Sequence, residues 1–188
     1  MTNMQSLEVM NAIYSRRAIR SYTDHPIENA ELLRLIDAAI QAPSYMNRQE
    51  WAFAIIQGKS RLEAYSDQAK AYYLTQPGSA SAHALSLLDR EVNIFHGAPS
   101  LVVICSTSPT QQAAEDCCLV AENFMLAAFA RGWGTCPIGF ARPWLTLAET
   151  KAQLGISAEL TPVFAVIVGQ AAESSASQGR KPPAVIWV

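Results

Sequence analysis

Three arginines near the N-terminus have the side chains and the spacing that most favour a specific chemistry. Arg16, Arg17 and Arg20 place three of the chain's 14 basic residues within five positions. In a helix, Arg16 and Arg20 would share a face, where like charges repel. A bound anion would stabilise such a cluster, and the planar guanidinium fork suits phosphate. The alternative is a basic last turn of a preceding helix, where cations complement the helix dipole.

A second polar stretch, residues 42–51 (APSYMNRQEW), lies where a predicted helix ends and a predicted strand begins. Pro43 ends the helix, because the residue before a proline is biased away from helical geometry. Asn47 and Gln49 carry amide side chains that donate and accept hydrogen bonds. They are suited to bind a polar ligand or, alternatively, to stabilise their own loop.

The usual sequence signatures of a side-chain catalyst are missing. The chain has no Gly-x-Gly-x-x-Gly after its first strand, no Gly-x-Ser-x-Gly elbow and no Gly-Lys-Ser phosphate loop. Its three histidines are far apart, and its four cysteines form no Cys-x-x-Cys, so no metal site is predicted. The cysteines are interpreted as small buried apolar residues in a reducing cytoplasm. We therefore expect a bound cofactor to carry the chemistry.

Length and composition indicate one domain over residues 1–188. Half of the residues are hydrophobic, which is enough for one well-buried core. Only 16% are charged, below the usual quarter, which favours a homo-oligomer interface. A net charge of −2 gives no general attraction to nucleic acid or anionic lipid. No signal peptide or membrane span is predicted, and we expect a cytoplasmic protein.

The pattern of apolar residues predicts a sheet covered by helices. Helices are expected over 7–14, 30–41, 59–73, 84–92, 113–131 and 145–154, with strands over 51–57, 101–105, 135–140 and 162–169. The strands are continuously apolar, which is typical of a sheet buried on both faces. Residues 119–130 are apolar nearly all round, so this helix is expected in a core or a subunit interface. Residues 75–81 are expected to form a loop.

Four motifs, in order along the chain, resemble those of the FMN-dependent nitroreductases. Residues 16–22 (RRAIRSY) are similar to the family's opening Arg-Arg-Ser-x-Arg-x-Phe/Tyr, and residues 42–51 to its Ala-Pro-Ser-x-x-Asn-x-Gln-Pro-Trp loop. Residues 131–134 (RGWG), followed by PIGF at 137–140, resemble its Gly-x-Gly and flavin-facing strand. GRKP at 179–182 resembles its C-terminal basic motif.

The resemblance implies an α+β fold with a mixed central β-sheet packed between helices. It also implies an obligate homodimer with one FMN per subunit at the dimer interface. The implied cofactor-binding residues are Arg16, Arg17, Ala18, Arg20, Pro43, Ser44, Asn47, Gln49, Pro137, Ile138, Gly139, Gly179 and Arg180. No metal is implied.

The implied roles follow the parts of FMN. Arg16 and Arg180 would hold the phosphate, and Arg20 the pyrimidine edge, where it would stabilise reduced flavin. The alternative for Arg20 is an ion pair with Asp24. Residues 137–139 would lie against the ring with a backbone N–H towards N5, and residues 43–49 would contribute from either subunit.

Three departures from the family pattern affect the site. Ala18 stands where a serine is common, Glu50 replaces the usual proline, and Ile138 lies where many members have glutamate. These changes leave FMN binding expected and the substrate open. Trp51 is interpreted as a core residue. Tyr45, Met46, Tyr72 and Tyr73 either line the substrate site or serve ordinary packing.

The leading functional hypothesis is an FMN-dependent oxidoreductase with NADH or NADPH as electron donor. By ping-pong hydride transfer through flavin N5, it would reduce nitroaromatics, quinones or similar electron-poor small molecules. Two alternatives remain open: a flavin-binding or regulatory dimer without significant turnover, and a family member of the reductive dehalogenase type.

Overall fold

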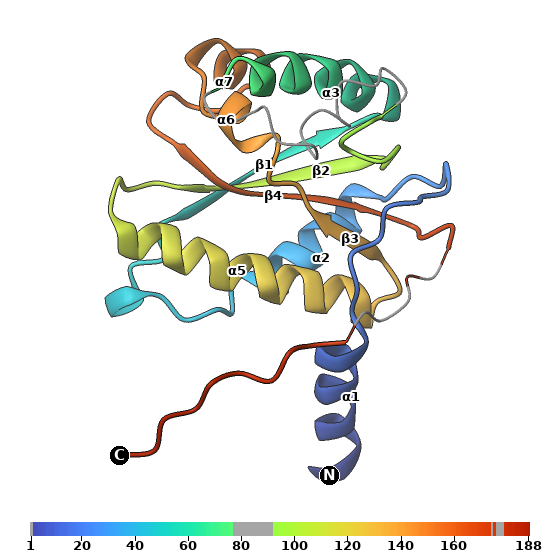
Figure 1. The fold of residues 1–188 in the computed structure, drawn as a ribbon, viewed down its shortest axis with the longest axis vertical. Helices are drawn as coiled ribbons and strands as arrows, with labels where there is room; N and C mark the ends of the chain where they lie inside the picture. The colour runs from blue at the N-terminus through green and yellow to red at the C-terminus, as the bar shows by residue number, and fades with distance from the viewer. Residues whose placement is uncertain (1, 77–91, 174, 176–178) are drawn as a thin grey trace.

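A four-stranded sheet forms the centre of the protein, whose computed structural model describes residues 2–76, 92–173, 175 and 179–188 (Figure 1). The strands are β1 (Trp51–Gln57), β2 (Ser100–Ser106), β3 (Gly134–Pro137) and β4 (Thr161–Gly169), in the order β1-β2-β4-β3. All three pairings are antiparallel. A single bridge between Ala18 and Thr135 is parallel. The α+β class is confirmed, and the parallel part of the predicted mixed sheet is confined to this bridge among the described residues.

Helices cover both faces of the sheet, as the continuous apolar strands predict (Figure 1). One face packs against α2 (Asn29–Ala39) and α5 (Gln111–Ala130). The other packs against α3 (Lys59–Leu74), α6 (Arg142–Leu145) and α7 (Ala148–Leu154). Within β2, Leu101 and Val103 face the second layer, whereas Val102 and Ile104 face the first. Successive strand residues point to opposite faces, so a strand between two helical layers must be apolar throughout.

Helix α5 begins two residues before the predicted start. The Thr110 hydroxyl caps it by accepting a hydrogen bond from the Ala113 N–H at 3.3 Å. Glu115 and Asp116 therefore lie beyond the first turn of the helix. Asp116 is instead buried and accepts from the Tyr45 N–H at 3.0 Å. It ties the loop before β1 to this helix.

The predicted helix over 145–154 is broken in two. The Thr146 hydroxyl donates to the Pro143 carbonyl at 2.7 Å and ends α6 after one turn. Such side-chain bonds to the backbone compete with helix continuation. Leu147 is extended, and α7 starts at Ala148. The predicted strand over 135–140 also ends early, at Pro137, because a turn follows in which the Arg142 N–H donates to the Gly139 carbonyl.

The two ends of the chain extend from the body of the protein (Figure 1). Helix α1 (Thr2–Ser15) projects from the α2–α5 side, and the C-terminal segment runs away from the sheet without regular structure. No helix within the described ranges is long and apolar enough to cross a membrane. The predicted loop over 75–81 and helix over 84–92 fall largely outside the described residues.

Candidate functional site

The arginine segment is extended rather than helical. Helix α1 ends at Ser15, and the chain then runs alongside β3, where the Ile19 N–H donates to the Thr135 carbonyl at 2.9 Å. Gly134 makes this approach possible, because a Cβ there would lie 2.9 Å from Ile19 Cγ1. Arg16 and Arg20 therefore do not share a helix face. The alternative of a basic last helical turn is also wrong, since α1 has no basic residue in its last turn.

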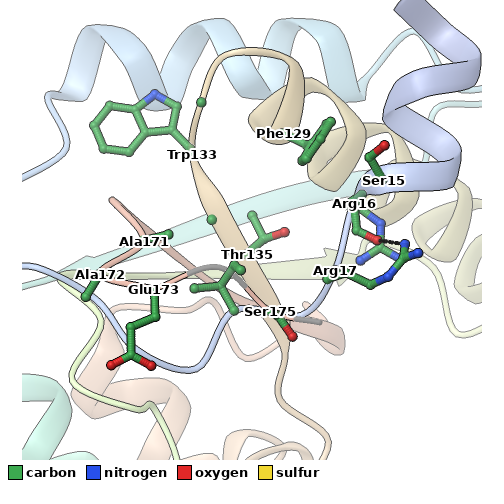
Figure 2. Close-up of a pocket in the computed structure, with 13 residues that line it drawn as sticks. Ser15, Arg16, Arg17, Phe129, Trp133, Thr135, Ala171, Ala172, Glu173 and Ser175 are labelled. Atoms are coloured by element: carbon green, nitrogen blue, oxygen red, sulfur yellow. Dashed lines mark hydrogen bonds between the residues drawn. The ribbon is translucent and has the colours of Figure 1, made fainter. Parts of the chain in front are cut away.

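Arg16 and Arg17 line a cavity of about 360 Å³ beside β3 (Figure 2). The Arg16 side chain is only 18% exposed, and its Nε lies 3.6 Å from a Glu122 carboxylate oxygen. That Nε is buried and has no hydrogen-bond partner. Arg17 donates to the Arg16 carbonyl at 2.6 Å. Glu173 also lines the cavity, but Figure 2 shows its carboxylate pointing away from both guanidinium groups.

This cavity has the donor set of an anion site. A buried guanidinium nitrogen with no hydrogen bond carries a desolvation cost that an anionic acceptor would offset. Glu122, half exposed, is too distant from Arg16 for a hydrogen bond. The residues present therefore fit a phosphate group at this end of the segment.

A larger cavity of about 580 Å³ lies at the other end of the segment. It is lined by Arg20, Tyr73, Val92, Ile94, His96, Cys136, Pro137, Ile138, Gly139 and Phe140. Tyr73 and Phe140 meet edge to face with ring centroids 4.9 Å apart. The lining is mostly apolar, with cationic Arg20 at its edge, which suits a planar ring system that has one polar edge.

A third hollow of about 230 Å³ shares lining residues with each of these two. It is lined by Ala18, Ile19, Arg20, Ser21, Glu173 and Ser175. It shares Ile19 and Glu173 with the cavity at Arg16, and Arg20 with the larger cavity. The segment from Arg16 to Arg20 thus runs past three adjoining hollows. An elongated ligand with an anion at one end and a ring at the other fits this arrangement.

Residues 137–139 offer one candidate backbone donor to a ring in the larger cavity. Pro137 has no N–H, and Ile138 donates its N–H to the Ala165 carbonyl at 2.9 Å. This leaves the N–H of Gly139, whose surroundings are open, since a Cβ there would meet nothing within 4 Å. The Ile138 side chain is buried and contributes apolar surface.

The loop carrying Pro43, Ser44, Asn47 and Gln49 does not line any of these hollows. It contains the short 3-10 helix η1 (Tyr45–Asn47) and lies by the start of α5 (Figure 1), whereas Phe129 near the end of α5 lines the first cavity. Asp116, which binds this loop, and Phe129, which lines the first cavity, are separated by roughly 20 Å along the helix axis.

The amide side chains of this loop bond to each other. Gln49 donates its side-chain amide to Asn47 at 3.0 Å, and its backbone N–H to the Ser44 hydroxyl at 3.0 Å. This supports the loop-stabilising alternative within one chain. Met46, Asn47 and Gln49 all have positive φ angles, a conformation that non-glycine residues rarely adopt. The side chains are thus held in one arrangement on an exposed surface.

Gly179 and Arg180 are not among the described residues that line the hollows. Both lie exposed in the extended C-terminal segment, where Arg180 donates to the Gly179 carbonyl at 2.9 Å. Their predicted contact with a phosphate stays a prediction. Tyr45 and Met46 are also exposed, while Tyr72 packs against the core.

His96 and Cys136 line the larger cavity but were not among the predicted site residues. Burial, followed by the positive charge of Arg20, lowers the pKa of His96 below its ordinary value. Burial raises the pKa of the Cys136 thiol. His96 directly precedes a glycine at the entry to a buried strand, and that position was the only sequence signal. The described residues contain no group of three metal-ligating side chains.

Asp24 pairs with Lys59 rather than with Arg20. The Lys59 ammonium lies 2.7 Å from an Asp24 carboxylate oxygen. The alternative role predicted for Arg20, an ion pair with Asp24, is therefore not what the structure contains. Arg20 lines both the larger cavity and the third hollow.

Comparison with known proteins gives a consistent family. An FMN reductase [NAD(P)H] from Bacillus subtilis is 28% identical over 186 residues, covering 93% of this chain and 70% of that protein. The crystal structure of a nitroreductase with bound FMN from Bacteroides fragilis superposes with a TM-score of 0.82 and 24% identity, over all of both chains. An FMN-dependent nitroreductase from Mycobacterium smegmatis in complex with NADPH gives a TM-score of 0.68 and 17% identity, covering 95% and 100% of the two chains.

These likenesses extend over almost the whole chain rather than over one motif. Residues 13–170 match the nitroreductase family as a whole, a span that includes the arginine segment, the sheet and every described residue that lines the larger cavity. Three of the four motifs that suggested the resemblance lie within the matched span, and GRKP at 179–182 lies beyond it. The chain belongs to the nitroreductase family.

Proposed function

We propose that this protein is an FMN-dependent NAD(P)H oxidoreductase that reduces nitroaromatics, quinones or similar electron-poor acceptors. The observation that carries the proposal is the row of three adjoining hollows along residues 16–20. It begins at a buried, unbonded guanidinium nitrogen of Arg16 and ends at the mostly apolar cavity of Arg20 and residues 137–139. Family membership and relatives that are named for FMN and NAD(P)H support it.

Different residues would contact different parts of the cofactor. Arg16 and Arg17 would hold the phosphate, Ala18 and Ile19 the ribityl chain, and Arg20 the pyrimidine edge of the ring. FMN, when bound, supplies the redox chemistry by accepting a hydride at N5 and passing it to a second substrate. The Gly139 N–H is the donor we assign to that side of the ring. Ile138 and Phe140 exclude water beside it.

Both half-reactions would use one site, and the hydride transfers themselves need no acid–base pair. The donor nicotinamide and the acceptor would occupy the cavity in turn, each stacked against the ring. Alignment of two reactants in this way lowers a barrier by several kcal/mol, of order 7 for a well-oriented pair. The chain supplies orientation and fixed charge.

A second subunit would complete the site. Helix α1 exposes Val9, Met10, Ile13 and Tyr14, and the C-terminal segment exposes Val185 to Val188. Contiguous apolar surface of this kind marks an interface. We propose a homodimer in which the partner's residues 43–49 approach the cavities, with Gly179 and Arg180 reaching the phosphate. Four free cysteines, three of them buried, are consistent with a cytoplasmic setting.

The test is whether the purified protein is yellow with FMN and is bleached by NADH or NADPH under anaerobic conditions. Menadione or a nitroaromatic should restore the colour with catalytic turnover. A protein that binds FMN but is not bleached would be the flavin-binding dimer without turnover. Bleaching with reoxidation only by halogenated aromatics would indicate the dehalogenase type.

The Arg16→Ala variant tests whether flavin binding depends on the proposed phosphate site. Loss of a charge-assisted pair costs roughly 1.5–3 kcal/mol, which weakens FMN binding about 10- to 150-fold. The flavin should then be lost on gel filtration. Arg61→Ala removes an exposed arginine of α3 outside the hollows and is the matched control. Full flavin retention by Arg16→Ala would contradict the phosphate assignment.

A further inference from the structure

The segment before β2 holds His96 in a fixed and uncommon conformation. His96 has a φ of 53°, and its N–H donates to the Asn93 carbonyl at 2.9 Å. The Asn93 side-chain oxygen accepts the Phe95 N–H at 2.8 Å, which closes the turn a second time. A non-glycine residue in the left-handed region costs free energy, and such residues cluster at functional sites.

Buried side chains of α3 anchor the same turn. The Ser66 hydroxyl accepts the Ile94 N–H at 3.0 Å, and the Lys70 ammonium donates to the Val92 carbonyl at 2.7 Å. Both of these α3 side chains are buried, as are Ile94 and Phe95 within the core. The backbone that carries the imidazole is therefore held by buried contacts at the wall of the larger cavity.

The charged and titratable groups around His96 come from every element that packs against it. The cavity is shared with Arg20 of the arginine segment, Tyr73 of α3 and Cys136 of β3. Lys59, the neighbour of Gly97, is neutralised by Asp24, and Lys70 by Asp67 at 3.1 Å. None of the described residues that line this cavity is acidic.

These surroundings keep the imidazole neutral while the cavity lacks negative charge. Both burial and Arg20 lower the pKa of His96. Added negative charge in the cavity would act in the opposite direction, because an anion favours the protonated imidazole. The guanidinium of Arg20 stays charged throughout and cannot give up a proton, and burial holds the proton on the Cys136 thiol.

The proposed reaction needs one proton that the electron donor does not supply. NAD(P)H gives up a hydride, which is two electrons and one proton, and becomes NAD(P)⁺. A quinone takes up two electrons and two protons to become a hydroquinone. The second proton comes from solvent, and it must be taken up and delivered within the site.

On this geometry, and resting on the proposed function, we propose that His96 carries that second proton. An imidazole nitrogen of His96 takes one proton from solvent when NAD(P)H has delivered its hydride to the site. It releases that proton to the acceptor oxygen as the hydride is passed on, and becomes neutral again. Histidine is the side chain whose ordinary pKa allows both steps near neutral pH.

The decisive measurement is the number of protons taken from solvent when the FMN-loaded protein is reduced anaerobically by one equivalent of NADPH. A pH indicator in weakly buffered solution at pH 7 reports this number. We expect about one proton per FMN for the wild type and close to none for His96→Asn. Asparagine tolerates the left-handed conformation, so the turn should be preserved. His25→Asn, an exposed histidine outside the larger cavity, should match the wild type.

A second variant and a second readout keep the test decisive. In His96→Gln, the midpoint potential of FMN should fall half as steeply with pH as in the wild type, because one proton rather than two accompanies two electrons. Equal proton uptake, or equal slopes, in wild type and variants would overturn the role of His96 while leaving the proposed function intact. A protein that binds no FMN, or is not bleached, would overturn both.

Discussion

The three arginines of the opening segment have different surroundings, and each surrounding implies a different role. Arg16 is largely buried against Glu122, Arg17 bonds to the backbone of Arg16, and Arg20 is exposed and lines the larger cavity. The sequence predicts that this cluster binds an anion, because a bound anion would offset the repulsion among three like charges. It does not reveal the extended conformation, since that depends on a glycine 114 positions from Arg20 along the chain, Gly134, where a Cβ would meet Ile19.

Arg20→Gln tests whether a fixed charge at the cavity favours reduced FMN. Two-electron reduction adds negative charge to the ring, so a cation at its edge stabilises the reduced form over the oxidised form. With FMN at saturation, the midpoint potential should fall and reduction by NAD(P)H should slow about tenfold for each 1.4 kcal/mol lost. Bound flavin should stay near the wild-type level. An unchanged potential and an unchanged reduction rate in the flavin-loaded variant would make Arg20 a structural residue.

Glu31 predicts a specific loss of stability in acid. Its carboxylate accepts from Arg131 Nη2 at 2.9 Å, Arg34 Nη1 at 3.0 Å and Trp133 Nε1 at 3.2 Å. The Arg131 bond is the main cause that lowers the pKa of Glu31 from 4.5 to about 2. A carboxyl with a lowered pKa in the folded state stabilises the fold above its unfolded pKa, and this stabilisation is lost as the pH falls towards the folded value.

The melting temperature of the wild type should therefore fall as the pH drops from about 4.5 to about 2, and part of this fall should disappear in Glu31→Gln. At pH 7 the same variant should melt at a lower temperature than the wild type. Asp37→Asn, on an exposed position of α2, is the control and should keep the wild-type profile. Parallel curves for wild type and Glu31→Gln between these pH values would contradict the prediction.

Elements with one dominant apolar pattern were predicted from the sequence. Element boundaries that depend on the hydrogen bond of a single side chain were missed. The strand over 162–169 was found because burial on both faces demands continuous apolar residues. The strand over 51–57 was found from the same apolar pattern, although only Ile56 is fully buried in it. The break between α6 and α7 was missed because it depends on the Thr146 hydroxyl and the Pro143 carbonyl, whose bond no apolar periodicity reports. The predicted start of α5 was two residues late because the start depends on the Thr110 side chain, which caps the helix.

The junction between the arginine segment and β3 should be sensitive to a single methyl group. In Gly134→Ala, the new Cβ would lie within 3.1 Å of three Ile19 side-chain atoms. Overpacking of this kind costs about 1–3 kcal/mol and would displace the segment that carries Arg20. We expect lower stability in urea unfolding and weaker FMN binding. Gly139→Ala, where a Cβ meets nothing within 4 Å, is the stability control.

Ile19→Ala in the Gly134→Ala background would show whether this contact is the cause. The smaller side chain makes room for the added methyl group, so the two substitutions should be non-additive by at least about 0.5 kcal/mol. Additive effects would place the cost of Gly134→Ala somewhere other than at Ile19.

At the scale of the whole molecule, the predicted site residues fall into two groups. Residues from the segment 16–20 and residues 137–139 line the hollows, whereas none of the hollows is lined by residues 43–49 or by Gly179 and Arg180. The first group could be predicted from the order of the motifs, because the arginine segment and β3 pack against each other within one chain. The second group is proposed to reach the site from a partner subunit. Sequence motifs carry no information on which subunit provides a residue, so this part stays a prediction.

The assembly itself is testable through the C-terminal segment. Val185, Ile186, Trp187 and Val188 are between 60% and 121% exposed, an unusual surface for four consecutive apolar side chains. Burying such a side chain contributes roughly 1.5–3 kcal/mol, so a partner subunit that covers the segment would gain much of its affinity there. Deletion of residues 183–188 should weaken a wild-type dimer at least tenfold in sedimentation equilibrium.

FMN binding should weaken in the same variant, and by more at low protein concentration, because the site is proposed to be complete only in the dimer. Arg61→Ala, exposed on α3 and distant from both chain ends, should leave dimerisation and flavin content unchanged. The deletion distinguishes a cofactor site that is complete in one chain from a site that needs a partner subunit. If the truncated protein is monomeric yet holds FMN as tightly as the wild type, the hollows along residues 16–20 suffice for the cofactor. Residues 43–49 and Arg180 would then have no part in binding it, and a wild-type protein that sediments as a flavin-loaded monomer would lead to the same conclusion directly.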